Sequence, residues 1–210
     1  MIFKQIAVGP MQNFSYIVGD AKTKEGAIFD CGWEADKLLE IAKEEKLKIT
    51  KIILTHSHYD HVQRLDEIHD KTGAEIFAYE IEIEDIKRSA KSSLEIKPLK
   101  ENDIIHIGAI EGKIFHTPGH SKGAMCILLG KKLITGDTLF VNAMGRVDLP
   151  GSNPLEMFES LQKLKKLDDE IEIYPGHDYG DIPCDTLKNQ KKTNPYLKPD
   201  TKEKFMSLFR

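Results

Sequence analysis

Thr55-His56-Ser57-His58-Tyr59-Asp60-His61 is the stretch that decides the fold of this chain, and it directly follows the apolar run Ile52-Ile53-Leu54. A short aliphatic run bounded by polar residues predicts a buried strand, so the histidines begin where a strand ends. If the chain stays extended there, His56 and His58 project from one face, because side chains alternate along a strand. The apolar spacing after His61 then predicts a helix. Three imidazoles and a carboxylate are therefore expected at one corner of a sheet.

These side chains favour a divalent-metal site. Imidazole nitrogens and carboxylate oxygens suit zinc, iron and manganese, and no cysteine in the stretch adds a soft ligand. The alternative is a histidine-rich helix start whose rings cap the backbone or lie in solvent. Packing several titratable groups together is costly unless a metal compensates, so the pattern indicates metal binding.

The composition indicates one globular domain. The chain has 210 residues, enough for one well-buried domain and short for two, so we expect a single domain over residues 1–210. The net charge of −4 argues against a nucleic-acid partner. The sequence has neither an apolar run long enough to span a membrane nor a start typical of a signal peptide. We therefore expect a cytoplasmic protein without a nucleic-acid or membrane partner.

The order of the expected elements predicts two β-rich halves, each finished by helices. We expect strands at residues 2–8, 14–18, 26–30, 52–54, 75–79, 104–107, 112–116, 124–129, 132–135 and 171–174. Helices are expected at 34–45, from the histidine stretch to about 72, from 152 onward, and at 183–192 and 200–209. Two sheets packed together with helices outside would bury the apolar faces of both halves. The segment 80–103 has a weaker pattern, which fits either a lid or a surface excursion.

A helix start is especially clear at Ser152-Asn153-Pro154, where a capping residue precedes a proline at the first helical position. The expected buried face of this helix consists of Leu155, Phe158, Leu161, Leu164 and Leu167.

Three later loops each place a potential ligand directly after an expected strand. They are Thr117-Pro118-Gly119-His120, Thr135-Gly136-Asp137 and Pro175-Gly176-His177. Each has a glycine beside the ligand, which lets the backbone approach closely. Taken singly, Asp137 is more typical of a turn, and His120 of a surface loop, than either is of a metal site. Together with the first stretch they predict one constellation at strand ends, where functional loops commonly lie.

With Gly145-Arg-Val-Asp-Leu-Pro-Gly151 and Pro175-Gly-His-Asp-Tyr-Gly180, these motifs resemble the metallo-β-lactamase superfamily, and within it a short form of the glyoxalase II-like (hydroxyacylglutathione hydrolase-like) branch. The resemblance extends to about Leu197. It implies an α/β fold, the four-layer αββα metallo-β-lactamase sandwich, with two metal sites at one edge between the sheets. By this resemblance, the first metal would be held by His56, His58 and His120, the second by Asp60, His61 and His177, and Asp137 would bridge the two.

The resemblance implies a dinuclear metal-dependent hydrolase, with zinc the expected metal and iron or manganese possible. Two metals about 3.5–4 Å apart can share a water and lower its pKa towards about 7. The expected reaction is attack of this metal-bridging hydroxide on the carbonyl of a small-molecule thioester. Asp60 is expected to bind the second metal, or otherwise to orient the water or take its proton. The helical domain that supplies much of the glutathione site in longer relatives is not expected here, so glutathione specificity is not carried over.

The main alternative is a persulfide dioxygenase of the same branch. Such an enzyme would use one non-haem iron, held by His120, Asp137 and either His56 or His58. A nuclease is disfavoured by the net charge, and an exported β-lactamase by the absence of a signal-peptide pattern. A metal-binding protein without catalysis is disfavoured because all seven candidate ligands are present.

Some positions depart from the pattern of the relatives or have no clear role. Val62-Gln63-Arg64 stands where the relatives usually carry a glycine pair. Gln63 fits a contact to substrate or an exposed helical position equally well. Arg146 and Asp148 are expected to pair with each other or with backbone near the site, and Tyr179 to line the cleft or pack beneath it.

Overall fold

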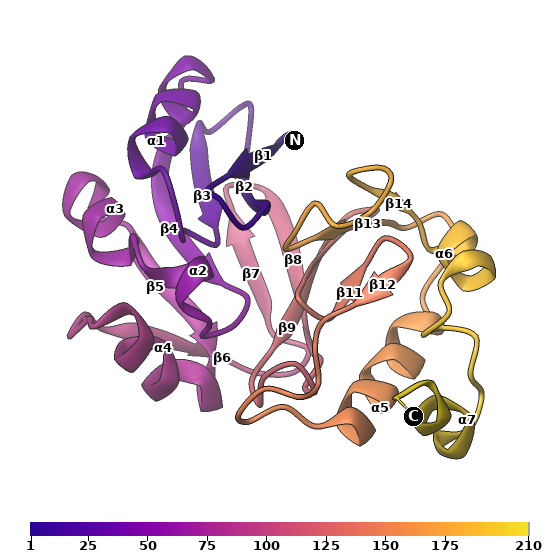
Figure 1. Cartoon of the computed structure of the whole chain (residues 1–210). Helices are drawn as coiled ribbons and strands as arrows, with labels where there is room; N and C mark the ends of the chain where they lie inside the picture. The colour runs from indigo at the N-terminus through magenta and orange to yellow at the C-terminus, as the bar shows by residue number, and fades with distance from the viewer. Residues whose placement is uncertain (210) are drawn as a thin grey trace.

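The computed structural model describes residues 1–209 and contains two six-stranded sheets that face each other (Figure 1). The first sheet has the order β1 (Ile2–Val8), β2 (Asn13–Gly19), β3 (Glu25–Phe29), β4 (Lys48–Leu54), β5 (Glu75–Tyr79) and β6 (Ile96–Leu99). The second has the order β14 (Asp185–Thr186), β13 (Glu172–Pro175), β10 (Lys132–Gly136), β9 (Met125–Leu129), β8 (Ile110–His116) and β7 (Ile104–Ile107). A small hairpin, β11 (Leu139–Phe140) and β12 (Ala143–Met144), completes the strands.

Helices cover the outer faces of both sheets, which makes four layers (Figure 1). The helices beside the first sheet are α1 (Ala35–Glu44), α2 (Tyr59–Val62), α3 (Leu65–Thr72) and α4 (Ile83–Ala90), the last preceded by the 3₁₀ turn η1 (Glu80–Glu82). Those beside the second sheet are α5 (Pro154–Lys165), α6 (Leu187–Thr193) and α7 (Lys202–Met206), followed by η2 (Ser207–Phe209). This is the αββα sandwich that the sequence predicted.

Alternation along β4 shows how the layers are built. Ile52 and Leu54 pack under the helices that cover the first sheet, whereas Ile53 points into the core between the two sheets. All three are fully buried, so both faces of the strand need apolar side chains. A third core lies between the second sheet and helices α5 to α7.

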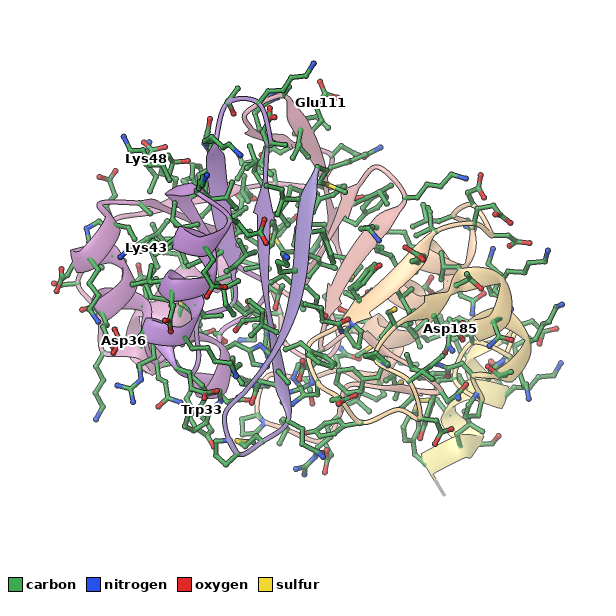
Figure 2. All side chains as sticks on the ribbon, turned by 90° about the horizontal axis from the view of Figure 1, so that it is seen from above. Trp33, Asp36, Lys43, Lys48, Glu111 and Asp185 are labelled. Atoms are coloured by element: carbon green, nitrogen blue, oxygen red, sulfur yellow. The ribbon has the colours of Figure 1, made fainter. Side chains whose placement is uncertain are left out.

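The two sheets meet where β10 and β13 end. β10 and β13 pair in parallel, so the residues that follow them, Asp137 and His177, leave the second sheet side by side. The first sheet joins them there, because the N–H of Phe14 donates to the carbonyl of Gly176 at 2.8 Å. Figure 2 shows Trp33 at one end of the first half of the chain, with Lys48, where β4 begins, at the opposite end. β4 therefore delivers its histidines to the end of the sheets where Trp33 lies.

The single helix expected after the histidine stretch is wrong, because α2 and α3 are separate helices. In a continuous helix the N–H of Arg64 would donate to the carbonyl of Asp60. It donates instead to the carbonyl of Cys31 at 2.9 Å, and the Asp60 carbonyl accepts from the side chain of Asn13 at 3.2 Å. A tertiary contact therefore ends α2 after one turn.

The buried face predicted for α5 is also partly wrong. Leu155 is 45% exposed, and Met157 is fully buried in its place. Apolar residues spaced by exactly three positions drift around a helix of 3.6 residues per turn, so Leu155 leaves the face on which Phe158, Leu161 and Leu164 are buried. Asn153 does cap the helix as predicted, accepting from the N–H groups of Leu155 and Glu156.

The segment 80–103 contains η1, α4 and β6, and β6 pairs with β5 as an edge strand of the first sheet. All three cysteines are free. Within residues 1–209, no helix combines the length and the apolar character that crossing a membrane requires.

Candidate metal centre

The first cluster of potential ligands forms where the end of β4 meets the loop between β8 and β9. His56 and His58 follow β4, and His120 lies in that loop. One ring nitrogen of each lies within 4.8 Å of the others. His56 and His120 are buried, and His58 is half-buried. The extended chain after β4 thus brings His56 and His58 to one side, as their spacing predicted.

The second cluster joins the start of α2 to the end of β13. Nε2 of His177 is 3.2 Å from Nε2 of His61 and 3.4 Å from Oδ2 of Asp60. Nε2 of His61 is 3.5 Å from the same carboxylate oxygen. All three side chains are buried. Two imidazole nitrogens and a carboxylate oxygen therefore converge on one small volume.

Asp137 lies between the two clusters. Its Oδ1 is 3.5 Å from Nε2 of His61, and its Oδ2 is 3.2 Å from Nε2 of His177 and 3.4 Å from Nε2 of His120. The carboxylate thus faces both clusters, as a bridging ligand must. The seven residues singled out in the sequence lie together in the two expected groups, and their binding of metal stays a prediction.

Four of the five histidine rings are oriented through Nδ1. The partners of Nδ1 are Thr55 Oγ1 for His56 at 3.0 Å, Asp30 Oδ2 for His61 at 2.9 Å, the Arg146 carbonyl for His120 at 2.8 Å and the Met11 carbonyl for His177 at 2.9 Å. A carbonyl or carboxylate oxygen can only accept, so Nδ1 carries the proton and donates. Nε2 is therefore the nitrogen that faces the centre and is available to a metal, which is the arrangement that metal-binding histidines use.

Several buried atoms of the centre have no hydrogen-bond partner among residues 1–209. They are Nε2 of His56, Nε2 of His120 and Oδ1 of Asp137. Buried polar atoms are nearly always paired, because an unpaired one costs about 1–3 kcal/mol. All three belong to predicted ligands and face one another. A divalent cation would satisfy them, so the residues present fit the metals that the resemblance implies.

The electrostatics of the metal-free protein fit the same interpretation. Burial, with the nearby His61, lowers the pKa of His56 well below its usual value, and burial lowers that of His58. Burial also acts to lower the pKa of His61, but the carboxylates of Asp137 and Asp30 outweigh it and raise the pKa to about 9. Burial acts to raise the pKa of Asp137, yet the surrounding histidines, His61 foremost, hold it well below the usual range. A proton on His61 thus supplies positive charge that a metal would otherwise supply.

Asn13, which the sequence analysis did not identify, fixes the carboxylate of Asp60. Its Nδ2 donates to Oδ2 of Asp60 at 2.8 Å and lies 3.3 Å from Nε2 of His61. Its Oδ1 accepts from the indole N–H of Trp33 at 2.9 Å, which fixes the amide orientation. Asn13 is 2% exposed. A polar residue at the start of a buried strand was the signal in the sequence.

Asp30 was missed as well. It accepts from the N–H and the hydroxyl of Thr55, both at 2.8 Å, and holds the ring of His61. An acidic residue directly after a buried strand, two positions before Gly32, was the available signal. Gly32 is itself required, because a Cβ there would lie 1.5 Å from the carbonyl oxygen of Asp60.

A cavity of about 440 Å³ opens onto the centre. Its polar lining includes the predicted ligands His58, Asp60, His120, Asp137 and His177, and the remaining lining residues are Met11, Tyr59, Phe140, Arg146, Leu149, Pro150 and Tyr179. Most of the second group are apolar or aromatic. Tyr179 lines the cleft, one of the two roles expected for it, and stacks on the ring of His177 with centroids 4.6 Å apart.

Two further expectations concern polar residues near the centre. Arg146 and Asp148 pair through two hydrogen bonds of 2.9 and 2.8 Å, as expected. Gln63 does not line the cavity, and its Nε2 is buried without a partner among residues 1–209.

Comparison with known proteins gives consistent matches. A sequence model described as the metallo-beta-lactamase superfamily matches residues 8–177. The chain is 31% identical over 197 residues to the "Probable polyketide biosynthesis zinc-dependent hydrolase PksB" of Bacillus subtilis, covering 93% of this chain and 86% of that protein. It is 35% identical over 169 residues to a hydroxyacylglutathione hydrolase of Maricaulis maris, covering 80% and 62%.

Two solved structures are similar over nearly the whole chain. ETHE1 from Myxococcus xanthus superposes with a TM-score of 0.89 at 27% identity, covering 99% of this chain and 89% of that one. TTHA1623, in a di-iron-bound form, superposes with a TM-score of 0.81 at 29% identity, covering 92% and 100%.

Proposed function

Because the chain belongs to the metallo-beta-lactamase superfamily, we propose that it is a metal-dependent hydrolase and that its substrate is a small-molecule thioester. The observation that carries the proposal is the pair of three-residue clusters joined by Asp137, with buried ligand atoms that lack partners within residues 1–209. Each cluster offers three ligand atoms, so the chain would hold two ions. A cytoplasmic location and the absence of nucleic-acid and membrane partners remain part of the proposal.

The donor set is made of nitrogen and oxygen and suits zinc, iron or manganese. We propose zinc, since PksB is named as a zinc-dependent hydrolase, and iron is the second choice because TTHA1623 is described in a di-iron-bound form. When bound, such ions would lower the pKa of a shared water towards about 7 and polarise a carbonyl oxygen.

The side chains around the centre have separate tasks in this proposal. Asp60 is fixed by Asn13, and its Oδ2 lies 3.4 Å from Nε2 of His177, so it acts as a ligand of the second metal rather than as a mobile base. His58 is half-buried and lines the cavity, so it would lie on the side of the first cluster that faces the substrate. The apolar walls exclude bulk water and so strengthen the interactions of charged groups within the cavity.

The lining of the cavity favours an uncharged substrate next to the reacting carbonyl. Apart from histidines, Arg146 is the only basic residue among those that line the cavity, and Asp148 already pairs with it. Tyr59 and Tyr179, each 51% exposed, line the cavity and offer aromatic surface to a substrate. A glutathione thioester carries two carboxylates that would find no free cation here. We therefore propose a thioester of an uncharged thiol carrier, and thiolate is a good leaving group because its conjugate acid has a pKa near 8.5.

The second candidate is the persulfide dioxygenase, which needs one iron. Nε2 of His120 lies 3.4 Å from Oδ2 of Asp137, and these two residues would provide two of the three iron ligands. The cluster of Asp60, His61 and His177 offers ligand atoms for a second ion, so we place the dinuclear hydrolase first, and the number of ions bound per chain distinguishes the two candidates.

Two measurements test the proposal. Elemental analysis of protein purified without chelators and without added metal should give near two zinc, iron or manganese ions per chain. The same protein should then hydrolyse an acyl thioester of N-acetylcysteamine, an uncharged thiol, with a kcat/KM at least tenfold above that for the glutathione thioester of the same acyl group. Two bound metals without thioester turnover would refute the reaction. One iron per chain with oxygen uptake in the presence of a persulfide would establish the second candidate.

A further inference from the structure

Glu82 is a buried carboxylate that the proposed chemistry does not use. It is the last residue of η1, the turn that directly follows β5, and it is 1% exposed. Its Oε1 accepts from the N–H of Ser57 at 3.0 Å, and its Oε2 accepts from the N–H of Gly123 at 2.6 Å. Each oxygen therefore binds the backbone of a different loop.

These two loops carry the whole first cluster. Ser57 lies between His56 and His58, in the loop that follows β4 of the first sheet. Gly123 ends the loop that contains His120 and joins β8 to β9 of the second sheet. Glu82 thus connects the ligands that come from one sheet to the ligand that comes from the other.

The neighbouring residues strengthen this connection. The ring of Tyr79 stacks on that of His116 with centroids 4.0 Å apart and an interplanar angle of 7°. Nε2 of His116 lies 2.9 Å from the carbonyl of Lys122, to which it donates. The turn 79–82 therefore holds the His120 loop where that loop begins and where it ends.

Gly123 is fitted to this contact. A Cβ at position 123 would lie 2.7 Å from Cβ of Glu82 and 2.8 Å from its Oε2. Any other residue would push the loop away from the carboxylate. The contact therefore requires a glycine at position 123 as well as the carboxylate of Glu82.

A carboxylate suits this position better than an amide would. The two N–H groups need two acceptors, and a carboxylate offers one on each oxygen. Glutamine has the same shape but only one acceptor, so its NH₂ group would face an N–H group. Burying a carboxylate is costly unless it is hydrogen-bonded, and here both of its oxygens are.

We propose that Glu82 is a positioning residue that sets the separation between the His56–His58 pair and His120, and thereby the affinity of the first metal. This inference rests on the proposed function, because it assumes that the centre binds two metals. Asp60, His61 and His177 have no hydrogen bond to Glu82. The second metal should therefore be insensitive to Glu82 and serves as an internal reference.

The test is zinc binding by the full-length Glu82→Gln protein, measured by competition with a chromophoric chelator after metal removal. One of the two zinc ions should bind about 10–100-fold more weakly than in the wild type, as changes to residues that orient ligands commonly cause. The other should bind with unchanged affinity. Glu82→Asp, which keeps the charge but is one methylene too short to reach both loops, should behave in the same way.

Glu84→Gln is the matched control, since the side chain of Glu84 is 81% exposed on the next turn of the chain and should leave both affinities unchanged. Thermal unfolding of the metal-free variants separates positioning from general stability. Wild-type affinity for both ions in both Glu82 variants would overturn the inference. Equal weakening of both ions, with a lower unfolding midpoint of the metal-free protein, would also overturn it. Failure of the proposed function would appear in the wild type itself, as an absence of two bound metals.

Discussion

One hydrogen bond at Nδ1 decides which ring nitrogen each of four histidines turns towards the centre. A histidine can present either ring nitrogen, and the choice follows from the partner of the other one. His61, His120 and His177 each meet an oxygen acceptor at Nδ1, so Nε2 faces the centre in every case. His56 reaches the same result through Thr55, whose hydroxyl donates onward to Asp30 and so must accept from the ring.

Asp137→Ala should abolish the bridge between the clusters. Asp137 faces ligands of both groups, so its loss weakens both sites at once. We expect bound metal to fall below one ion per chain and hydrolysis to fall by at least about 100-fold. Elemental analysis and steady-state kinetics measure the two effects, and Asp178→Ala, at an exposed position beside His177, is the control. Full metal content and turnover in Asp137→Ala would refute the assignment of the centre.

The metal-free protein should lose stability on both sides of about pH 6.5. The pKa of His61 is raised to about 9 in the folded protein, so its protonation stabilises the fold fully below about pH 6.5 and this contribution is lost as the pH rises through 9. The pKa of His56 is lowered, so the unfolded chain takes up that proton first and stability falls as the pH drops below about 6.5.

Urea unfolding of chelator-treated protein between pH 5 and pH 10 measures this profile. Added zinc should remove the alkaline loss, because the ion requires His61 without its Nε2 proton. A midpoint that climbs steadily from pH 7 to pH 9.5 without metal would contradict the role given to His61.

At the scale of elements, strand ends and helix starts position the ligand loops. The start of α5 supports the His120 loop, because the N–H of Asn153 donates to the carbonyl of Gly119 at 2.8 Å. Gly119 has φ +138° and packs so closely that a Cβ there would lie 2.4 Å from Cα of Met157. A glycine is needed for both reasons. The first turns of α5 therefore pack directly against the His120 loop.

Asn153→Ala should destabilise the protein by about 1 kcal/mol, within the usual range for losing a helix cap. The cap accepts from the N–H groups of Leu155 and Glu156, which alanine cannot do. Urea unfolding measures the loss. Thr201→Ala, which removes the cap of α7 instead, is the comparison variant. An unchanged free energy of unfolding in Asn153→Ala would contradict the role given to this cap.

At the scale of the whole molecule, the centre lies where the two sheets meet. His56, His58, Asp60 and His61 follow a strand of the first sheet, whereas His120, Asp137 and His177 follow strands of the second. Backbone hydrogen bonds cross between the sheets here, among them Met125 N–H to the Thr55 carbonyl at 3.0 Å. Bound metal would therefore tie the two halves together.

Metal removal should lower the unfolding midpoint of the whole chain in a single transition. An ion that binds only the folded protein stabilises it by about 4 kcal/mol at a free concentration 1,000 times Kd. Calorimetry with and without chelator measures the shift. Two separate transitions, of which only one responds to the chelator, would contradict both the tie between the sheets and the expected single domain.

The elements and ligands that follow from local patterns were predictable. β5 and β7 begin and end where the sequence predicted, because apolar runs bounded by turn residues signal strands locally. The division of α2 from α3 was not predictable, since it depends on Asn13 and Cys31, which are distant in sequence. Asn13, Asp30 and Glu82 were missed for the same reason. Each acts through a hydrogen bond to a residue at least 25 positions away.

The sequence by itself determined the identity of the seven candidate ligands and their position after strands, because donor chemistry and strand periodicity are both local properties. Only the tertiary structure decided which ring nitrogen each histidine presents and which carboxylates fix their loops. Those outcomes depend on the parallel pairing of β10 with β13 and on the packing of one sheet against the other. Such contacts join residues far apart in the chain, so no local pattern specifies them.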